Sequence, residues 1–159
     1  MLNTEAVVLA IQPYKDNASI VHLYTREQGR IQCLSYGKKF RFYPLTWIDI
    51  IAKQRSKDSF FYITYSALHF VPQQLSESPQ RQSIALFVSE VLYKTLKHPM
   101  QDERVFQFIC QTIQRIDLSD SIETIHLDFL KDFSVLLGYG GEMLEEWSNL
   151  KSIELFNMR

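Results

Sequence analysis

Cysteine is scarce in this 159-residue sequence, and long hydrophobic runs are missing. The two cysteines, Cys33 and Cys110, lie far apart in apolar segments. Because small disulfide-stabilised domains contain far more cysteine, we expect both residues to be buried free thiols. No stretch of about eighteen apolar residues occurs, so no membrane-spanning helix is expected. The N-terminus also lacks the basic and then apolar pattern of a signal peptide, which predicts a cytoplasmic protein.

Patterns that carry catalysis or metal binding are equally scarce. The four histidines are isolated and form no H-E-x-x-H spacing: His22, His69, His98 and His126. The glycines at 138–141 lack the Lys-Ser/Thr of a phosphate-binding loop and indicate a helix end. Asp128 and Asp132 lie four residues apart, as a metal-binding pair would, but a solvated helix face is the simpler interpretation. We therefore predict no enzyme activity, no metal site and no cofactor.

Charge is distributed unevenly, although the formal net charge is only −1. Residues 1–75 contain nine Lys or Arg against five Asp or Glu, whereas residues 76–159 contain eight against thirteen. The first part therefore has the charge to bind a polyanion, and the second is more typical of a scaffold or protein-binding module. Alternatively, the difference in charge between the two parts arises by chance.

Residues 1–75 have the alternating pattern of β-strands. We expect five strands, at residues 4–11, 19–25, 31–36, 45–51 and 60–69, with a turn at 13–17. Gly29 can adopt a positive φ in the tight turn between the second and third strands. Five short strands would expose long edges if the sheet stayed open. We therefore predict a five-stranded antiparallel barrel of the OB-fold type as a first domain, residues 1–75.

Residues 76–159 have helical periodicity, which predicts an α+β fold with a C-terminal all-helical domain. Ser78 and Pro79 predict the start of a first helix, and Pro99 its end. Asp102 predicts the N-cap of a second helix. A third helix is expected to follow a weak capping box formed by Asp120 and Glu123 and to end at Gly138, and residues 142–147 would add a short fourth. Such amphipathic helices must pack on one another or on the barrel.

Cations and aromatic rings cluster around the predicted hairpin at residues 19–36 and in the loops that follow. This combination suits a single-stranded nucleic acid, because rings stack on bases and cations neutralise phosphates. The predicted DNA-binding residues are Arg26, Arg30, Tyr36, Lys38, Lys39, Phe40, Arg41, Lys53, Arg55 and Lys57. We expect Phe42 and Tyr43 to fill the ends of the barrel and Trp47 to lie in the core. Alternatively, any single one of these Lys or Arg residues is an ordinary solvated side chain.

Several segments follow one another in a recognisable order. Residues 4–9 open the chain as a strand, residues 20–30 read Ile-Val-His-Leu-Tyr-Thr-Arg-Glu-Gln-Gly-Arg, and residues 35–39 form a basic loop. A strand at 44–50, a long helix at 83–93 and a later helix with a glycine stop at 127–139 come next. In this order and spacing, over roughly residues 4–140, the chain resembles the RecO family of bacterial DNA repair proteins.

The resemblance implies an N-terminal OB domain, a helical C-terminal domain and no enzyme activity. It implies a recombination mediator that binds single-stranded and double-stranded DNA, anneals complementary strands and acts with RecR in loading RecA. It also implies binding to the acidic C-terminal tail of single-stranded-DNA-binding protein, and hence association with the nucleoid. Many members carry a four-cysteine zinc cluster, but only Cys110 lies in the helical half of this chain, so a compact, zinc-free form is expected.

An acidic tail that ends in an apolar residue requires a hydrophobic slot with a cation at its edge. The candidate partner-binding cations on the helical half are Arg104, Arg115 and Lys131, flanked by Phe108, Ile116 and Phe129. Two other interpretations stay open. The barrel could serve as a protein-binding adaptor with little DNA binding, which the acidic total favours slightly, or as an OB module for RNA or oligosaccharide.

Overall fold

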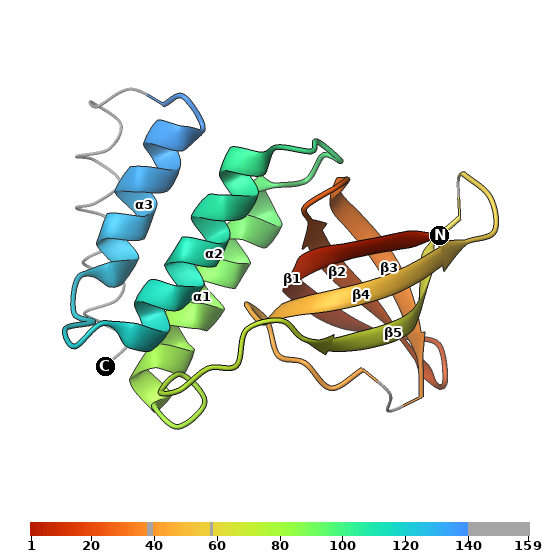
Figure 1. Cartoon of the computed structure of the whole chain (residues 1–159), viewed down its shortest axis with the longest axis horizontal. Helices are drawn as coiled ribbons and strands as arrows, with labels where there is room; N and C mark the ends of the chain where they lie inside the picture. Colours follow the sequence, from red (N-terminus) through yellow and green to blue (C-terminus); the bar gives the residue numbers. More distant parts are fainter. Residues whose placement is uncertain (38–39, 58, 140–159) are drawn as a thin grey trace.

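The computed structural model describes residues 1–37, 40–57 and 59–139 of the chain. Five strands come first in the sequence and three helices follow. The strands are β1 (Leu2–Tyr14), β2 (Ala18–Thr25), β3 (Gly29–Tyr36), β4 (Trp47–Gln54) and β5 (Phe61–Leu68). The helices are α1 (Pro79–Thr95), α2 (Glu103–Leu118) and α3 (Ile125–Leu136). The strands close into a barrel, and α1 and α2 lie between that barrel and α3 (Figure 1).

The barrel confirms the predicted N-terminal fold, with one difference in strand pairing. The order around it is β1-β2-β3-β5-β4, and β4 pairs with β1 to close it. Four neighbouring pairs are antiparallel, whereas β3 and β5 are parallel. A closed ring with an odd number of strands cannot alternate in direction throughout, so one parallel pair is unavoidable. The expectation of antiparallel pairing is therefore wrong at this pair only.

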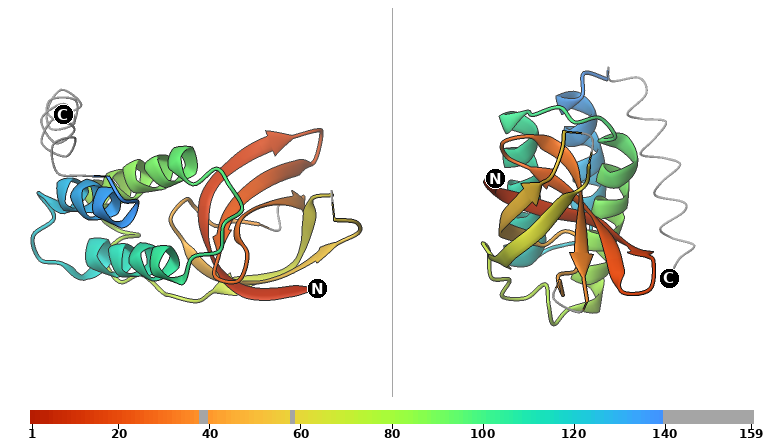
Figure 2. Two further views of the ribbon diagram at one scale, coloured as in Figure 1. Left: turned by 90° about the horizontal axis from the view of Figure 1, so that it is seen from above. Right: turned by 90° about the vertical axis from the view of Figure 1, so that its right-hand side faces the viewer.

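Buried hydrophobic side chains form two clusters, one inside the barrel and one between the barrel and the helices. Ala6 and Val8 of β1 belong to the interior cluster. Val7 and Leu9 alternate with them and pack in the helix-side cluster. This stretch of β1 is therefore buried on both faces, which explains why it is apolar without interruption. The helices that cover it all lie on one side of the barrel (Figure 2).

The predicted starts of the first two helices are confirmed. The side chains of Ser78 and Asp102 each accept a hydrogen bond from a backbone N–H in the first turn, at 3.3 and 2.9 Å. The predicted capping box of the third helix is wrong, because α3 begins only at Ile125, after residues 120–123, and its N-cap makes no side-chain hydrogen bond. The predicted fourth helix, at 142–147, lies outside the described residues.

β1 is longer than predicted and takes up part of the expected turn at 13–17. The strand continues through Pro13 to Tyr14, and the chain reverses only at residues 15–17, where Lys15 has a φ of +50°. Proline is tolerated near the end of a strand because the missing N–H interrupts few ladder hydrogen bonds there. The extension brings Tyr14 into register with Ala18 of β2.

The structure confirms the predicted positions of some apolar residues and contradicts those of others. Cys33 and Cys110 are buried free thiols, as predicted. Phe42 is partly buried against the interior cluster. Tyr43 is 82% exposed, so its predicted place at an end of the barrel is wrong. Trp47 is partly buried and packs against the helix-side cluster rather than inside the barrel.

The loop between α1 and α2 is fixed against the turn between β2 and β3. The hydroxyl of Tyr24 donates to the carbonyl oxygen of Met100 at 3.1 Å. Burial, followed by the nearby charge of Asp102, raises the pKa of Tyr24 to about 12, so this hydroxyl keeps its proton. Gly29, with a φ of +68°, places its backbone directly against Met100. The helical part is therefore held in one position beside the hairpin.

A buried carboxylate fixes the segment that connects the barrel to the helices. Asp117, near the end of α2, has no exposed surface. Its oxygens accept hydrogen bonds from the backbone N–H groups of Gln73, Gln74 and Leu75 at 2.8–3.0 Å. Burial opposes the charge of Asp117, but these hydrogen bonds and the nearby Arg81 hold its pKa below the ordinary value. The connecting segment is thus tied to the second helix.

Candidate nucleic-acid interface

The outer face of β2 and β3 brings several predicted binding residues together. Residues paired across neighbouring strands point to the same side of a sheet, and so do residues two apart in one strand. Tyr14, Ala18 and Tyr36 are paired across β1, β2 and β3 and form one outward-facing row. Leu34, two residues before Tyr36, pairs with Tyr62 of β5. Tyr62 therefore lies on the same face.

Four aromatic rings form what we call the aromatic patch: Tyr14, Tyr36, Phe60 and Tyr62. The rings of Tyr36 and Tyr62 stack with centroids 6.1 Å apart and planes at 7°, and the Tyr14 and Phe60 centroids are also 6.1 Å apart. The Arg55 guanidinium lies 5.3 Å from the Tyr62 centroid, and Lys15 Nζ lies 5.2 Å from that of Tyr14. Tyr36 is 55% exposed, so the stack is open to solvent at this ring.

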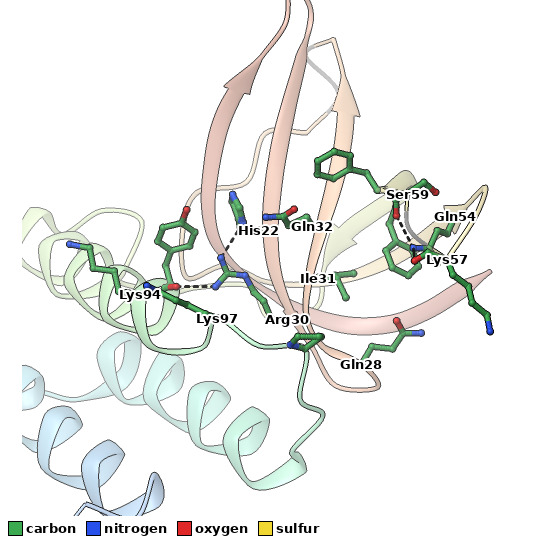
Figure 3. Close-up of a pocket in the computed structure, with 14 residues that line it drawn as sticks. His22, Gln28, Arg30, Ile31, Gln32, Gln54, Lys57, Ser59, Lys94 and Lys97 are labelled. Carbon is green, nitrogen blue, oxygen red and sulfur yellow. Dashed lines mark hydrogen bonds between the residues drawn. The ribbon is translucent and has the colours of Figure 1, made fainter.

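A groove of about 810 Å³ adjoins the patch and shares Phe60 with it. It lies between the outer face of β2 and β3, the turn after β4, and the C-terminal end of α1 (Figure 3). The cations that line it are Arg30, Lys57, Lys94 and Lys97. Among the described residues of its lining there is no Asp or Glu to offset them. We call it the cationic groove.

Arg30 is held at the helix end of this groove. Its Nη1 donates to the carbonyl oxygens of Tyr93 and Leu96, both at 3.0 Å, and its guanidinium lies 4.6 Å from the Tyr93 ring centroid. Its Nη2 lies 3.1 Å from His22 Nδ1. Arginine can only donate, so Nδ1 accepts, and His22 Nε2 donates to Gln12 Oε1 at 3.1 Å. Burial and the Arg30 charge lower the pKa of His22 to about 4, which keeps this ring neutral at pH 7.

Arg26 lies at the junction between the barrel and α2. Its guanidinium forms ion pairs with Glu5 and with Glu103, the latter at 3.1 Å between Nε and Oε1. It also lies 4.8 Å from the ring centroid of Phe106. Arg26 and Arg30, both predicted to bind DNA, therefore have partners within the fold that join the barrel to the helices.

Three predicted cations come from the end of β4 and the turn that follows it. Lys53, Arg55 and Lys57 are all exposed. Lys53 pairs in register with Tyr62, so it borders the aromatic patch, as Arg55 does. Lys57 lines the cationic groove. The structure thus brings these three cations to the same face as Tyr36.

The loop after β3 carries the remaining predicted DNA-binding residues. Arg41 is exposed. Phe40 is partly buried against the interior cluster, with its ring in edge contact with that of Phe42 at 5.2 Å. Lys38 and Lys39 lie outside the described residues. Phe40 therefore contributes to the packing of the barrel.

A second groove, of about 360 Å³, lies between α2 and α3, and we call it the α2–α3 groove. Phe108 and Phe129 provide apolar lining, and Arg115 lines it as well. Arg115 Nη2 lies 3.0 Å from Asp128 Oδ2. The sequence predicts an apolar slot with a cation among these residues, and the three line one groove.

The other two candidate partner-binding cations lie elsewhere. Arg104 and Lys131 are exposed, but neither lines the α2–α3 groove. Arg104 instead pairs with the N-cap residue Asp102, at 3.2 Å between Nη2 and Oδ2. Ile116, expected to flank the slot, is buried in the helix-side cluster.

Five residues of this interface were not selected from the sequence. Phe60, just before β5, and Tyr62 of β5 are two residues apart, and this period of two indicates that both rings point to one face. Tyr14 was assigned to a turn, and its ring joins the patch because β1 is longer. No local sequence pattern identifies Lys94 and Lys97 as part of the interface. They lie beside the barrel because the end of α1 is held there, for example by the hydrogen bond from Arg30 to the carbonyl oxygen of Tyr93, 63 positions away in the sequence.

The part of the chain that the structure describes has neither a metal-binding cluster nor a membrane-spanning helix. In that part, no group of three or more His, Cys, Asp or Glu side chains is arranged to hold a metal ion. None of its helices combines the length and the apolar character required to cross a lipid bilayer.

Comparison with known protein families gives two matches along the chain. The family model described as "Recombination protein O N terminal" matches residues 1–69, the barrel. The model described as "Recombination protein O C terminal" matches residues 76–145, which include the three helices.

Individual relatives agree with these matches. The chain is 30% identical over 161 residues to a DNA repair protein RecO of Porphyromonas gingivalis, with 91% of this chain and 66% of the relative covered. It is 32% identical over 144 residues to a DNA repair protein RecO of Phocaeicola vulgatus, with 85% of this chain and 60% of the relative covered. The chain thus spans about two thirds of the length of these relatives or less.

Proposed function

The chain belongs to the RecO family of DNA repair proteins, and from this premise we propose that it is a non-enzymatic recombination mediator that binds single-stranded DNA on the outer face of its barrel. Bases would stack on the aromatic patch, and phosphates would contact Lys53, Arg55 and Lys57. The basic loop at 38–41, which includes Arg41, belongs to the same proposal. Binding of this kind carries little sequence information, which suits a repair protein.

The observation that carries the proposal is the open stack of Tyr36 on Tyr62 beside a groove whose described lining residues include no carboxylate. OB barrels bind oligonucleotides on the face of strands 2 and 3 and with the loop between strands 4 and 5. The aromatic patch and the cationic groove occupy this region. Aromatic rings contribute about 1–3 kcal/mol per stacked base, and cations add a salt-dependent affinity.

On the same premise, we extend the proposal to the other functions that membership of the RecO family implies. The chain would bind double-stranded DNA, anneal complementary strands, and act with RecR in loading RecA in the cytoplasm at the nucleoid. Neutralised phosphates let two strands approach each other, because the repulsion between their backbones is reduced. For RecR the support is the family alone.

Replacing Tyr36 by alanine is expected to weaken single-stranded DNA binding by roughly 5- to 100-fold, because one stacked base is lost. Fluorescence anisotropy of a labelled oligo(dT), measured at two salt concentrations with the full chain, gives the affinity. Tyr36→Phe should keep most of the affinity, since the ring remains.

Tyr65→Ala is the matched control, because Tyr65 is also 55% exposed but pairs with Ile51 of β4, outside the patch. Its affinity should stay close to that of the unchanged protein. Equal losses in both variants, or no loss in Tyr36→Ala, would refute the proposed face. A chain that binds no DNA at all at low salt would support the adaptor function instead.

We also propose that the α2–α3 groove binds the acidic C-terminal tail of single-stranded-DNA-binding protein. Its apolar lining suits a terminal apolar residue, and Arg115 suits a carboxylate. Because Arg104 and Lys131 do not line this groove, the proposal keeps Arg115 alone. The peptide would have to replace Asp128 as the partner of Arg115 and to bind beside Asp132, which also lines the groove.

Arg115→Ala is expected to weaken binding of a tail peptide by about tenfold or more, since a charge-assisted hydrogen bond is lost. Isothermal titration calorimetry with the peptide measures this change. Lys131→Ala removes an exposed cation of α3 that does not line the groove, and it should bind normally. Identical affinities for the unchanged protein and Arg115→Ala would exclude Arg115.

A further inference from the structure

The cationic groove has one wall that does not belong to the barrel. Tyr93, Lys94 and Lys97 come from the end of α1 and the residues just after it, and they line the groove together with Lys57. Figure 3 shows Lys94 and Lys97 at the helix side of the groove and Lys57 at its far side. The helical part, with its excess of acidic residues, would not be expected to bind a polyanion. At this position, however, it contributes two lysines to a lining in which the described residues include no carboxylate.

We propose that Lys94 and Lys97 contact phosphates of the same DNA strand whose bases stack on the aromatic patch, so that one strand crosses from the barrel to the helical part. The inference rests on the proposed function and goes beyond it by adding a second contact region. Lys94 also pairs with Glu90 at 2.8 Å. An exposed pair of this kind contributes little, so a phosphate can replace Glu90 as the partner.

The end of a helix is normally a poor place for a phosphate. The last carbonyl groups of α1 have no partner within the helix, and together they carry a partial negative charge. Here Arg30 donates to two of them, those of Tyr93 and Leu96. The guanidinium therefore offsets the negative helix end where the groove passes it, and the field near Lys94 and Lys97 stays positive.

The helical wall is also fixed relative to the barrel. The Gln12 amide donates to the hydroxyl of Tyr93 at 3.1 Å, and Tyr24 donates to Met100 in the loop that follows the two lysines. Contacts on both sides of Lys94 and Lys97 therefore hold this segment before any ligand arrives. A preformed site loses less entropy on binding than one that must be assembled.

The two contact regions are separated along the strands. Ala18 pairs with Tyr36 at the patch, and Tyr24 pairs with Arg30 beside the helical wall. Five residues of β2 lie between these rows, so the rows are six residue steps, or about 20 Å, apart. A short oligonucleotide can therefore occupy the patch alone, whereas a longer one can reach both regions.

The test is the double variant Lys94→Gln/Lys97→Gln in the full chain, with anisotropy titrations of oligo(dT) of about 5 and about 15 nucleotides, the range of OB-fold site sizes. Each phosphate contact contributes about 0.7 to the salt slope of single-stranded binding, so we expect the slope for the longer oligonucleotide to fall by about 1.4 and its affinity at 0.1 M salt to fall roughly 20-fold. The shorter oligonucleotide should lose little.

The control is Arg104→Gln/Lys131→Gln, which removes two exposed charges from the same part of the chain but none from the groove. It should keep the salt slope of the unchanged protein. An equal loss in the control, or equal losses with both oligonucleotides, would show a general charge effect and overturn the inference. If Tyr36→Ala weakens binding and the double lysine variant does not, the inference fails while the proposed function stands. If the unchanged protein does not bind, both fail.

Discussion

Replacing Gly29 by alanine is expected to lower the free energy of unfolding by about 3 kcal/mol or more, since positive φ contributes roughly 1–2 kcal/mol and overpacking roughly 1–3 kcal/mol. Gly29 has a φ of +68°, which disfavours any residue with a Cβ. An added Cβ would lie 2.6 Å from the carbonyl carbon of Met100 and closer still to its oxygen. Both obstacles are backbone atoms, so no side-chain rotation relieves the contact.

Gly37→Ala separates the two effects, because Gly37 has nearly the same φ, +69°, but among the described residues an added Cβ would meet only the side chain of Asn17, at 4.0 Å. This variant should lose about 1–2 kcal/mol, the strain contribution alone. Urea unfolding followed by circular dichroism measures both variants. Equal losses would mean that the loop at Met100 is not packed against the hairpin.

The second large effect is expected for Asp117→Ala, which should lower the free energy of unfolding by about 3 kcal/mol, because buried N–H groups lose their acceptor. Three backbone N–H groups of residues 73–75 and the charge of Arg81 would lose a buried carboxylate partner. Asp120→Ala is the control, since Asp120 is exposed and follows the same helix. Similar losses in the two variants would contradict the anchoring role.

The stabilising role of Asp117 should also appear in the pH dependence of the free energy of unfolding. The pKa of Asp117 is lowered in the folded state, so its contribution is fully present above the unfolded value of about 3.9 and is lost as pH falls through the lower folded value. The free energy of unfolding of the unchanged protein should therefore decrease more steeply below about pH 5 than that of Asp117→Asn. Parallel curves for the two proteins would show that Asp117 does not titrate in this way.

The main features of the fold could be predicted from local patterns. Alternation predicted the strands, and Ser78 and Asp102 predicted two helix starts, because N-caps depend on neighbouring residues. The parallel pairing of β3 with β5 is different, since it follows only once the ring of five strands is closed. The start of α3 was misplaced because Asp120 and Glu123 match a capping pattern that the chain does not use.

The candidate site was predictable where residues are near in sequence. Lys53 and Arg55 lie beside the ring of Tyr62, which stacks on that of Tyr36. Arg26 and Arg30 belong to the hairpin that was selected, but their guanidinium groups contact residues of the helical part, and the sequence does not reveal such distant partners. Asp117 falls on the apolar face of α2, and a charged residue at such a position is the signal that would have identified it.

In the proposed function, single-stranded DNA lies along the outer face of β2 and β3. The most direct measurement is photocrosslinking of the full chain to an oligonucleotide that carries photoreactive pyrimidines, with the adducts mapped by peptide mass spectrometry. We expect adducts at the aromatic patch, on Tyr14, Tyr36, Phe60 or Tyr62. Adducts confined to Tyr65 or to the surfaces of α2 and α3 would contradict it.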